Sequence, residues 1–283
     1  MRTGVAAAVL LCFIWGRGVP AADAPAVPTA TGPHTKLQLI SDLLTLQPGR
    51  ELELGLLFNL EPHWHIYWIN PGDSGEPPAV TWHLPPGFRA ADLEWPAPHR
   101  LVNGPLTDYG YQDRVLLIAP VHVPSEIQEQ KVTLSADVSW LVCSNVCIPA
   151  KSAVSVDLPV QRGAPHLDAQ TRYLFRTAQH DLPQPLPAGW RVTAEDEGSV
   201  FRIRLSAGAK IRQASFFPLD FNQVENAQPQ TPVPLATGIE LTVHKSDQLL
   251  KPVRQLRGVL VIDGGRAYQV TAAVKARASH ENS

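Results

Sequence analysis

The stretch that decides the fold covers residues 132–158 and reads VTLSADVSWLVCSNVCIPAKSAVSVDL. Apolar and polar residues alternate along it on both sides of Cys143-Ser144-Asn145-Val146-Cys147. Alternation with a period of two is typical of a half-buried β-strand, and a three-residue loop between two such strands indicates a β-hairpin. The sequence therefore predicts antiparallel strands over 132–142 and 152–158, with the two cysteines near the closing pair.

The predicted hairpin brings Cys143 and Cys147 within bonding reach. Opposed residues of antiparallel strands have Cα atoms ~4.5–5.5 Å apart, which overlaps the range that a disulfide requires. A bridge that closes so short a loop stabilises a fold by only ~2 kcal/mol on the chain-entropy model. An accessible dithiol at a loop tip also suits reversible exchange through a mixed disulfide. From the residues alone, a redox role and a structural hairpin disulfide are equally good interpretations.

Short β-prone runs recur along the rest of the 283-residue chain, separated by turns rich in its 27 Pro and 19 Gly residues. This pattern indicates an all-β protein of sandwich type. We predict one β-sandwich domain over 35–160, a linker with a short helix and a Pro-rich stretch over 161–189, and a second β-sandwich domain over 190–277. Further strands are expected at 37–46, 52–60, 63–69, 79–83, 91–95, 115–123, 190–194, 200–205, 214–217, 239–244, 253–262 and 268–274, and a helix at 164–179.

Residues 1–24 have the features of a cleavable secretory signal peptide. Arg2 precedes an apolar stretch over 5–15 that is too short to span a bilayer, and Ala22-Asp23-Ala24 fits a cleavage site. A membrane anchor or a buried helix is the alternative. Cleavage would remove Cys12 and leave one cysteine pair in an oxidising compartment, with no membrane span in the mature chain.

Several function classes find no support in the sequence. A net charge of −2 provides no basic excess for nucleic-acid binding. Motifs for serine hydrolysis, for phosphate binding and for dinucleotide binding are missing, and we expect no cofactor. Copper handling stays open as an alternative, because reduced thiolates select Cu(I), although C-x-x-x-C is not a strong metal spacing. The histidines that favour this alternative are His63, His65, His83 and His99. A two-domain interaction module with a structural disulfide is a third interpretation.

Three stretches together resemble a known family. Residues 140–149, WLVCSNVCIP, resemble the active-site hairpin of the amino-terminal periplasmic domain of the DsbD family of thiol:disulfide interchange proteins, and look closest to its ScsB branch. Residues 63–75, HWHIYWINPGDSG, and residues 108–117, DYGYQDRVLL, are similar to family stretches in the same order. The resemblance covers roughly residues 35–160, and the block beyond residue 190 also resembles the ScsB amino-terminal region.

The resemblance implies immunoglobulin-like sandwiches and a periplasmic protein-disulfide reductase component whose catalytic residues are Cys143 and Cys147. On family analogy Cys147 attacks first and Cys143 resolves the mixed disulfide, although the sequence itself does not order them. The pair would receive electrons from a partner and pass them to oxidised periplasmic proteins. Since the chain has neither a transmembrane conduit nor a thioredoxin-like domain, we expect the donor to be a separate membrane conduit or thioredoxin-like protein. The alternative is that the chain acts as an oxidant or isomerising partner instead.

The resemblance also implies a movable cap loop over residues 108–111 that shields the cysteine pair. It assigns the cap role to Tyr109, with Tyr111 next to it, and Gly110 between them would give the loop backbone freedom. Ordinary core or turn aromatics are the alternative interpretation of the two tyrosines. Asp108 would serve as a proton acceptor if the loop lies over the pair, but an exposed turn aspartate is an equally good interpretation.

Overall fold

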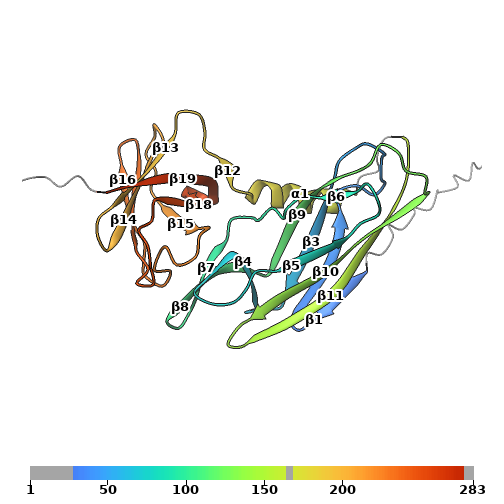
Figure 1. The fold of residues 1–283 in the computed structure, drawn as a ribbon, viewed down its shortest axis with the longest axis horizontal. Helices are drawn as coiled ribbons and strands as arrows, with labels where there is room; N and C mark the ends of the chain where they lie inside the picture. Colours follow the sequence, from blue (N-terminus) through green and yellow to red (C-terminus); the bar gives the residue numbers. More distant parts are fainter. Residues whose placement is uncertain (1–27, 164–167, 277–283) are drawn as a thin grey trace, which may run out of the picture.

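The computed structural model describes residues 28–163 and 168–276, and Figure 1 shows two bodies of β-strands with one short helix between them. This helix, α1 (Ala169–Asp181), is the one α-helix of the described ranges. The predicted all-β class, with sandwich domains joined by a short helix, is confirmed. The predicted signal peptide lies outside the described residues.

The first domain is a sandwich of two antiparallel sheets. Its strands are β1 (Thr29–Gly32), β2 (Thr35–Ser41), β3 (Leu52–Leu60), β4 (His65–Gly72), β5 (Ala79–His83), β6 (Arg89–Ala90), β7 (His99–Asn103), β8 (Leu106–Gln112), β9 (Arg114–His122), β10 (Lys131–Cys143) and β11 (Cys147–Pro159). One sheet has the order β1-β2-β3-β9-β6 and the other β11-β10-β4-β8-β7, with β5 paired to β10. Leu56, Leu134 and Trp140 belong to the core that the two sheets enclose.

The cysteine hairpin forms as the alternation predicts. β10 and β11 pair without interruption from Lys131 opposite Pro159 to Cys143 opposite Cys147. Both strands are longer than predicted, because pairing continues through residues 147–151, where the polar and apolar alternation is weak. The two cysteines therefore stand at the closed end of a long, regular hairpin.

Helix α1 covers the outer face of the first sheet. Asp168 caps the helix by accepting a hydrogen bond of 2.7 Å from the backbone N–H of Thr171. Phe175 and Ala178 are buried against Leu57 and Leu116 of the sheet. The predicted helix over 164–179 overlaps α1, and residues 164–167 lie outside the described residues. Because α1 covers this face, β3 is buried on both sides rather than half-buried.

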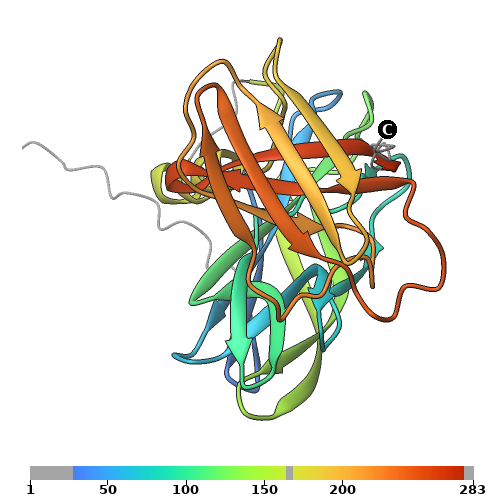
Figure 2. The same ribbon diagram turned by 90° about the vertical axis from the view of Figure 1, so that its left-hand side faces the viewer.

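The second domain is built from one sheet that folds back on itself. Its strands are β12 (Gln184–Pro185), β13 (Arg191–Asp196), β14 (Val200–Ser206), β15 (Ala214–Pro218), β16 (Thr231–Leu235), β17 (Gly238–His244), β18 (Gln255–Ile262) and β19 (Arg266–Ala276). β19 pairs with β18 up to Ala273 and then runs parallel to β13, so it joins the two halves. In Figure 2 the red strands β18 and β19 cross the orange strands of the other half. The halves enclose a second core that includes Phe201, Leu241 and Leu260.

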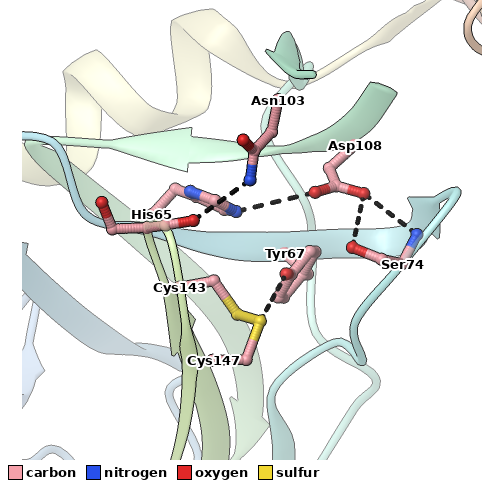
Figure 3. Close-up of a disulfide and its surroundings, with 8 residues drawn as sticks. His65, Tyr67, Ser74, Asn103, Asp108, Cys143 and Cys147 are labelled. Carbon is pink, nitrogen blue, oxygen red and sulfur yellow. Dashed lines mark hydrogen bonds and ion pairs between the residues drawn. A yellow bond between two sulfur atoms is a disulfide. The ribbon is translucent and has the colours of Figure 1, made fainter. Parts of the chain in front are cut away.

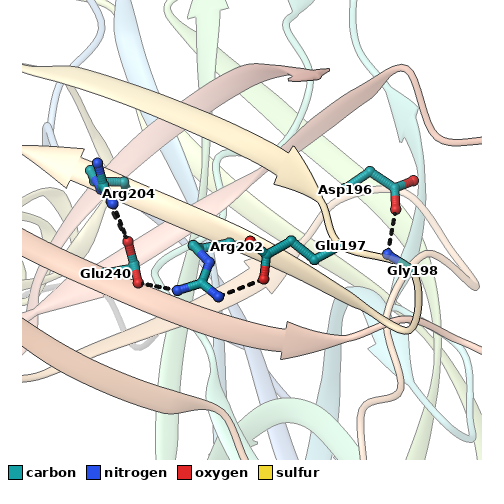
Figure 4. A network of polar contacts seen from close by, with 6 residues as sticks. All are labelled: Asp196, Glu197, Gly198, Arg202, Arg204 and Glu240. Carbon is teal, nitrogen blue, oxygen red and sulfur yellow. Dashed lines mark hydrogen bonds and ion pairs between the residues drawn. The ribbon is translucent and has the colours of Figure 1, made fainter. Parts of the chain in front are cut away.

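An ion-pair network holds two neighbouring strands of this second domain together (Figure 4). Glu240 on β17 accepts hydrogen bonds of 2.6 Å from both Arg202 and Arg204 on β14, and Arg202 also pairs with Glu197. Burial alone would raise the pKa of Glu240, but the hydrogen bonds from Arg204 and Arg202 outweigh it and hold the pKa below its ordinary value.

The two domains pack against each other through β4 and β8. Phe217 of the second domain lies edge-on to Trp68 at 6.4 Å and to Tyr109 at 5.2 Å between ring centroids. The side chain of Asn70 donates a hydrogen bond of 2.8 Å to the carbonyl of Pro218. The first core continues into this contact, so the second domain covers one end of the first. The domain boundaries at residues 160 and 190 stay predictions.

Two predictions about local structure are wrong. Residues 91–95 are not a strand, and their one ladder contact is an isolated bridge between Glu94 and Ile118. The segment 108–111, predicted as a movable loop, lies inside strand β8 between β4 and β7. Both faces of this strand are buried, so it lacks the polar and apolar alternation by which strands are recognised.

Candidate functional site

The Cys143–Cys147 disulfide lies at the closed end of the β10–β11 hairpin, and its two cysteines have different surroundings. Their Cα atoms are 4.1 Å apart. Cys143 is 1% exposed and pairs with His65 of β4. Cys147 is exposed, and the neighbouring loop residue Val146 is 61% exposed. Of the two cysteines, Cys147 is therefore the one that an attacking group from solvent can approach.

The side chain that contacts the disulfide is Tyr67 of β4. Its hydroxyl lies 3.4 Å from the Sγ of Cys147 (Figure 3) and donates the hydrogen bond, since a disulfide sulfur carries no proton. The ring is fully buried, and the backbone of Gly75 lies flush against it: a Cβ on Gly75 would come within 2.1 Å of the ring. Burial raises the pKa of Tyr67, so the hydroxyl keeps its proton at neutral pH.

A buried carboxyl and imidazole lie behind Tyr67. Asp108 accepts hydrogen bonds through Oδ1 from the backbone N–H of Ser74 at 3.0 Å and from its hydroxyl at 2.8 Å. The other oxygen, Oδ2, lies 3.8 Å from Nε2 of His65, as Figure 3 shows. Burial raises the pKa of Asp108 and lowers that of His65. The imidazole is therefore uncharged at neutral pH, and two titratable groups stand close to the disulfide.

The β7–β8 hairpin borders the disulfide loop on the open side. Asn103, at its tip, donates a hydrogen bond of 3.1 Å to the carbonyl of Ser144 (Figure 3). Val102 and Leu106, on the same tip, are 74% and 41% exposed. A pocket of about 330 Å³ opens between the hairpin and the disulfide loop, and its lining residues are His63, His65, Arg100, Leu101, Val102, Asn103, Gln112, Ser144 and Asn145.

The residues predicted as a cap are placed differently from the prediction. Tyr109 is fully buried, and its hydroxyl donates to Asn226 of the second domain at 2.9 Å. The hydroxyl of Tyr111 donates to the carbonyl of Pro96 at 2.7 Å. Gly110 does not serve as a hinge: a Cβ there would lie 2.1 Å from the carbonyl oxygen of Ile66 on β4, so the absent side chain permits close strand pairing.

Sequence reasoning missed Tyr67, Ser74 and Asn226 as parts of the site. Tyr67 and Ser74 fall within the stretch 63–75, whose resemblance to a family motif was the available signal. Asn226 has no such signal, because it comes from the second domain and reaches the site only through folding.

The histidines of the copper alternative do not all lie near the cysteines: His65 pairs with Cys143, but His99 lines a different pocket. His83 is paired with Asp137 at 3.1 Å, whereas His63 lines the pocket beside the disulfide loop. Within residues 28–163 and 168–276, no group of three or more His, Cys, Asp or Glu side chains is arranged to hold a metal ion. In the same ranges, no helix has the length and apolar character needed to span a membrane.

Comparisons with known proteins identify the first domain. The family model described as "Thiol:disulfide interchange protein DsbD, N-terminal" matches residues 42–159. A search of the curated proteins gave no match. The solved structure of the N-terminal periplasmic domain of ScsB from Proteus mirabilis is similar with a TM-score of 0.65 at 18% identity, over 88% of this chain and 98% of that one. The solved structure of the periplasmic chaperone SfaE is also matched, over 84% of this chain and 100% of the SfaE chain. Its TM-score of 0.22 at 7% identity is too low to indicate a shared fold.

The family match includes all the residues that surround the disulfide in the first domain, from Tyr67 to Cys147. The likeness to ScsB extends beyond this match and supports the two-domain fold of the whole chain. Residues 42–159 therefore belong to the family of DsbD amino-terminal domains, in a chain that shares the fold of the ScsB amino-terminal periplasmic domain.

Proposed function

We propose that this chain is a periplasmic thiol–disulfide exchange protein, a disulfide reductase component that passes electrons from a membrane or thioredoxin-like donor to oxidised exported proteins through Cys143 and Cys147. The observation that carries the proposal is the difference in exposure within the pair, since Cys143 is buried and Cys147 is exposed. A purely structural disulfide does not require one of its two cysteines to be exposed. The family match and the periplasmic domain of similar fold support the same assignment.

The exchange proceeds in two sulfur transfers. A thiolate of the reduced donor attacks the Sγ of Cys147, the disulfide breaks, and Cys143 leaves as a thiolate that takes up a proton. The donor's second thiol then attacks the donor sulfur of the mixed disulfide, and Cys147 is released. Two electrons and two protons have moved to this chain, and the donor is left with a disulfide. In the second half of the cycle Cys147 attacks a client disulfide, and Cys143 resolves the mixed disulfide.

The surroundings suit these steps. The hydroxyl of Tyr67 can hydrogen-bond to the Cys147 thiolate, which stabilises the attacking form. Asp108 and His65 form a buried pair behind it through which a proton can be held near the site, and we propose Asp108 as the acceptor. The roles of Tyr109 and Tyr111 in this scheme are to fix β8 and therefore Asp108, rather than to cover the sulfurs.

Trapping of mixed disulfides tests the proposal. A Cys143→Ser variant keeps Cys147, whose thiol is first converted to a mixed disulfide with thionitrobenzoate. A thioredoxin-like protein with a single active-site cysteine is expected to displace thionitrobenzoate and to remain in a mixed disulfide with Cys147. A Cys147→Ser variant is the matched control and is expected to accumulate far less. A redox titration of the wild-type protein against glutathione completes the test. A bond that stays oxidised at the potential of reduced thioredoxin would show that the bridge is structural and would overturn the proposal.

A further inference from the structure

One side chain of the second domain reaches the network around the disulfide. Asn226 lies between β15 and β16 and has both ends of its amide engaged with the first domain. Its Oδ1 accepts a hydrogen bond of 2.9 Å from the hydroxyl of Tyr109, and its Nδ2 donates one of 2.8 Å to Oδ1 of Asp73. Its backbone carbonyl accepts a further bond of 2.5 Å from Arg100. The side chain thus ties β8 and the segment after β4 to the second domain.

Asp73 transmits this contact to the segment that follows β4. Its second carboxylate oxygen accepts from the backbone N–H of Thr107 at 2.7 Å, and its own N–H donates to the carbonyl of Thr107 at 3.1 Å. The carboxylate therefore bridges the start of β8 and Asn226. Because all three contacts converge on Asp73, residues 73–75 are held in place from both domains.

The next two residues hold Tyr67 against the Cys147 end of the disulfide. Ser74 donates two hydrogen bonds to Asp108, and Gly75 lies against the ring of Tyr67 so closely that no side chain fits between them. The hydroxyl of Tyr67 in turn contacts Cys147. A continuous series of contacts therefore runs from Asn226 through residues 73–75 to Tyr67 and the Sγ of Cys147.

We infer that Asn226 is a positioning residue through which the second domain holds the hydroxyl of Tyr67 against the Sγ of Cys147, and so limits how much of that sulfur an incoming thiol can reach. The inference rests on the proposed exchange function and assigns a regulatory role to the second domain in it. Asn226 acts through Tyr67 and not on the sulfurs. Loss of its side chain leaves Asp73 with contacts to one domain only, so local opening of residues 73–75 becomes more frequent.

The rate of disulfide reduction by dithiothreitol measures this opening without any protein partner. For Asn226→Ala we expect reduction to be about tenfold faster than in the wild type. A tenfold change corresponds to about 1.4 kcal/mol in the free energy of opening residues 73–75, which is within the range of one or two hydrogen bonds. The control is Gln228→Ala, because the Gln228 side chain is exposed and the residue contacts Arg100 through its backbone carbonyl alone. This control is expected to reduce at the wild-type rate.

A double-variant cycle with Tyr67→Leu distinguishes positioning from general loosening. If Asn226 acts through Tyr67, adding Asn226→Ala to Tyr67→Leu changes the rate little. A full tenfold effect in that background, or an unchanged rate in Asn226→Ala alone, would overturn the inference. Hydrogen exchange at the amides of Ser74 and Gly75 in Asn226→Ala gives a second readout if Tyr67→Leu fails to fold: faster exchange supports the inference, and unchanged exchange refutes it. If the wild-type disulfide resists reduction at every potential that thioredoxin-like proteins reach, the proposed exchange function fails. The ratio of the reduction rates of Asn226→Ala and wild type by dithiothreitol still tests the positioning role in that case.

Discussion

Replacing Gly75 by alanine places a methyl group into the ring of Tyr67, whose hydroxyl contacts the disulfide. Gly75 has φ +79°, and a Cβ there would lie 2.1, 2.3 and 2.4 Å from three ring atoms of Tyr67. A residue with a Cβ in the left-handed region costs about 1 kcal/mol. Because Tyr67 is fully buried, displacing its ring costs about a further 1–3 kcal/mol. Gly75→Ala is therefore expected to lower the free energy of unfolding by about 2–4 kcal/mol.

Gly198 provides a matched control for the backbone strain. It has the same φ of +79°, but nothing lies within 4 Å of a Cβ built on it. Gly198→Ala is expected to cost only the ~1 kcal/mol of the left-handed backbone. The difference between the two variants, about 1–3 kcal/mol, then measures the contact with Tyr67.

Denaturant unfolding of the oxidised proteins gives their free energies of unfolding, and the rate of reduction by dithiothreitol reports on the contact between Tyr67 and Cys147. Displacement of the Tyr67 ring in Gly75→Ala would break the contact of its hydroxyl with the Sγ of Cys147 and leave more of that sulfur accessible. We therefore expect faster reduction in Gly75→Ala and a wild-type rate in Gly198→Ala. Equal losses of stability in the two variants, together with equal rates of reduction, would show that Gly75 does not hold Tyr67 in place.

Three further substitutions test the electrostatics of the molecule. Tyr67→Phe keeps the ring but removes the hydroxyl that lies 3.4 Å from the Sγ of Cys147. We expect the pKa of the Cys147 thiol in the reduced protein to rise by about one unit, as measured from the pH dependence of its alkylation. An unchanged pKa would count against the hydrogen bond. Burial raises the pKa of Asp108 in the folded state, so its ionisation lowers the free energy of unfolding as the pH rises from 3.8 through the raised pKa. In denaturant titrations, Asp108→Asn should therefore become more stable relative to the wild type across that pH range. Parallel pH profiles of the two proteins would contradict this. The pKa of Glu240 is lowered in the folded state, so the stability that its ionised form contributes is present above the unfolded pKa of 4.5 and is lost as the pH falls through the folded pKa. Glu240→Gln should lower the free energy of unfolding by about 1–2 kcal/mol at pH 7. Thermal unfolding should show this difference disappearing in acid.

The sequence predicted the cysteine hairpin because the forces that form it are local. Residues 132–142 alternate strictly between the core and the outer face, and the partner strand follows after three residues, so pairing needs no distant information. Strand β8 is the opposite case. Its residues Thr107 to Tyr111 are all buried, because the second domain packs on Tyr109 from one face and Ser74 contacts Asp108 on the other. A short run without alternation, with a glycine in it, gives the same signal as a loop.

The order of the two cysteines shows most clearly where sequence reasoning stops. Side chains alternate between the two faces of β10, so Cys143 is expected on the outer face with the exposed residues Thr133 and Ser139. No feature of the neighbouring sequence distinguishes it from Cys147. Its burial arises from β4, where His65 pairs with it across a long separation in sequence. The same strand carries Tyr67, so a single long-range pairing both buries Cys143 and places a hydroxyl beside Cys147. The chemical difference between the two cysteines is therefore a product of tertiary structure. It is fixed by β4, which contacts the second domain through Trp68 against Phe217 and through Asn70 bonded to Pro218.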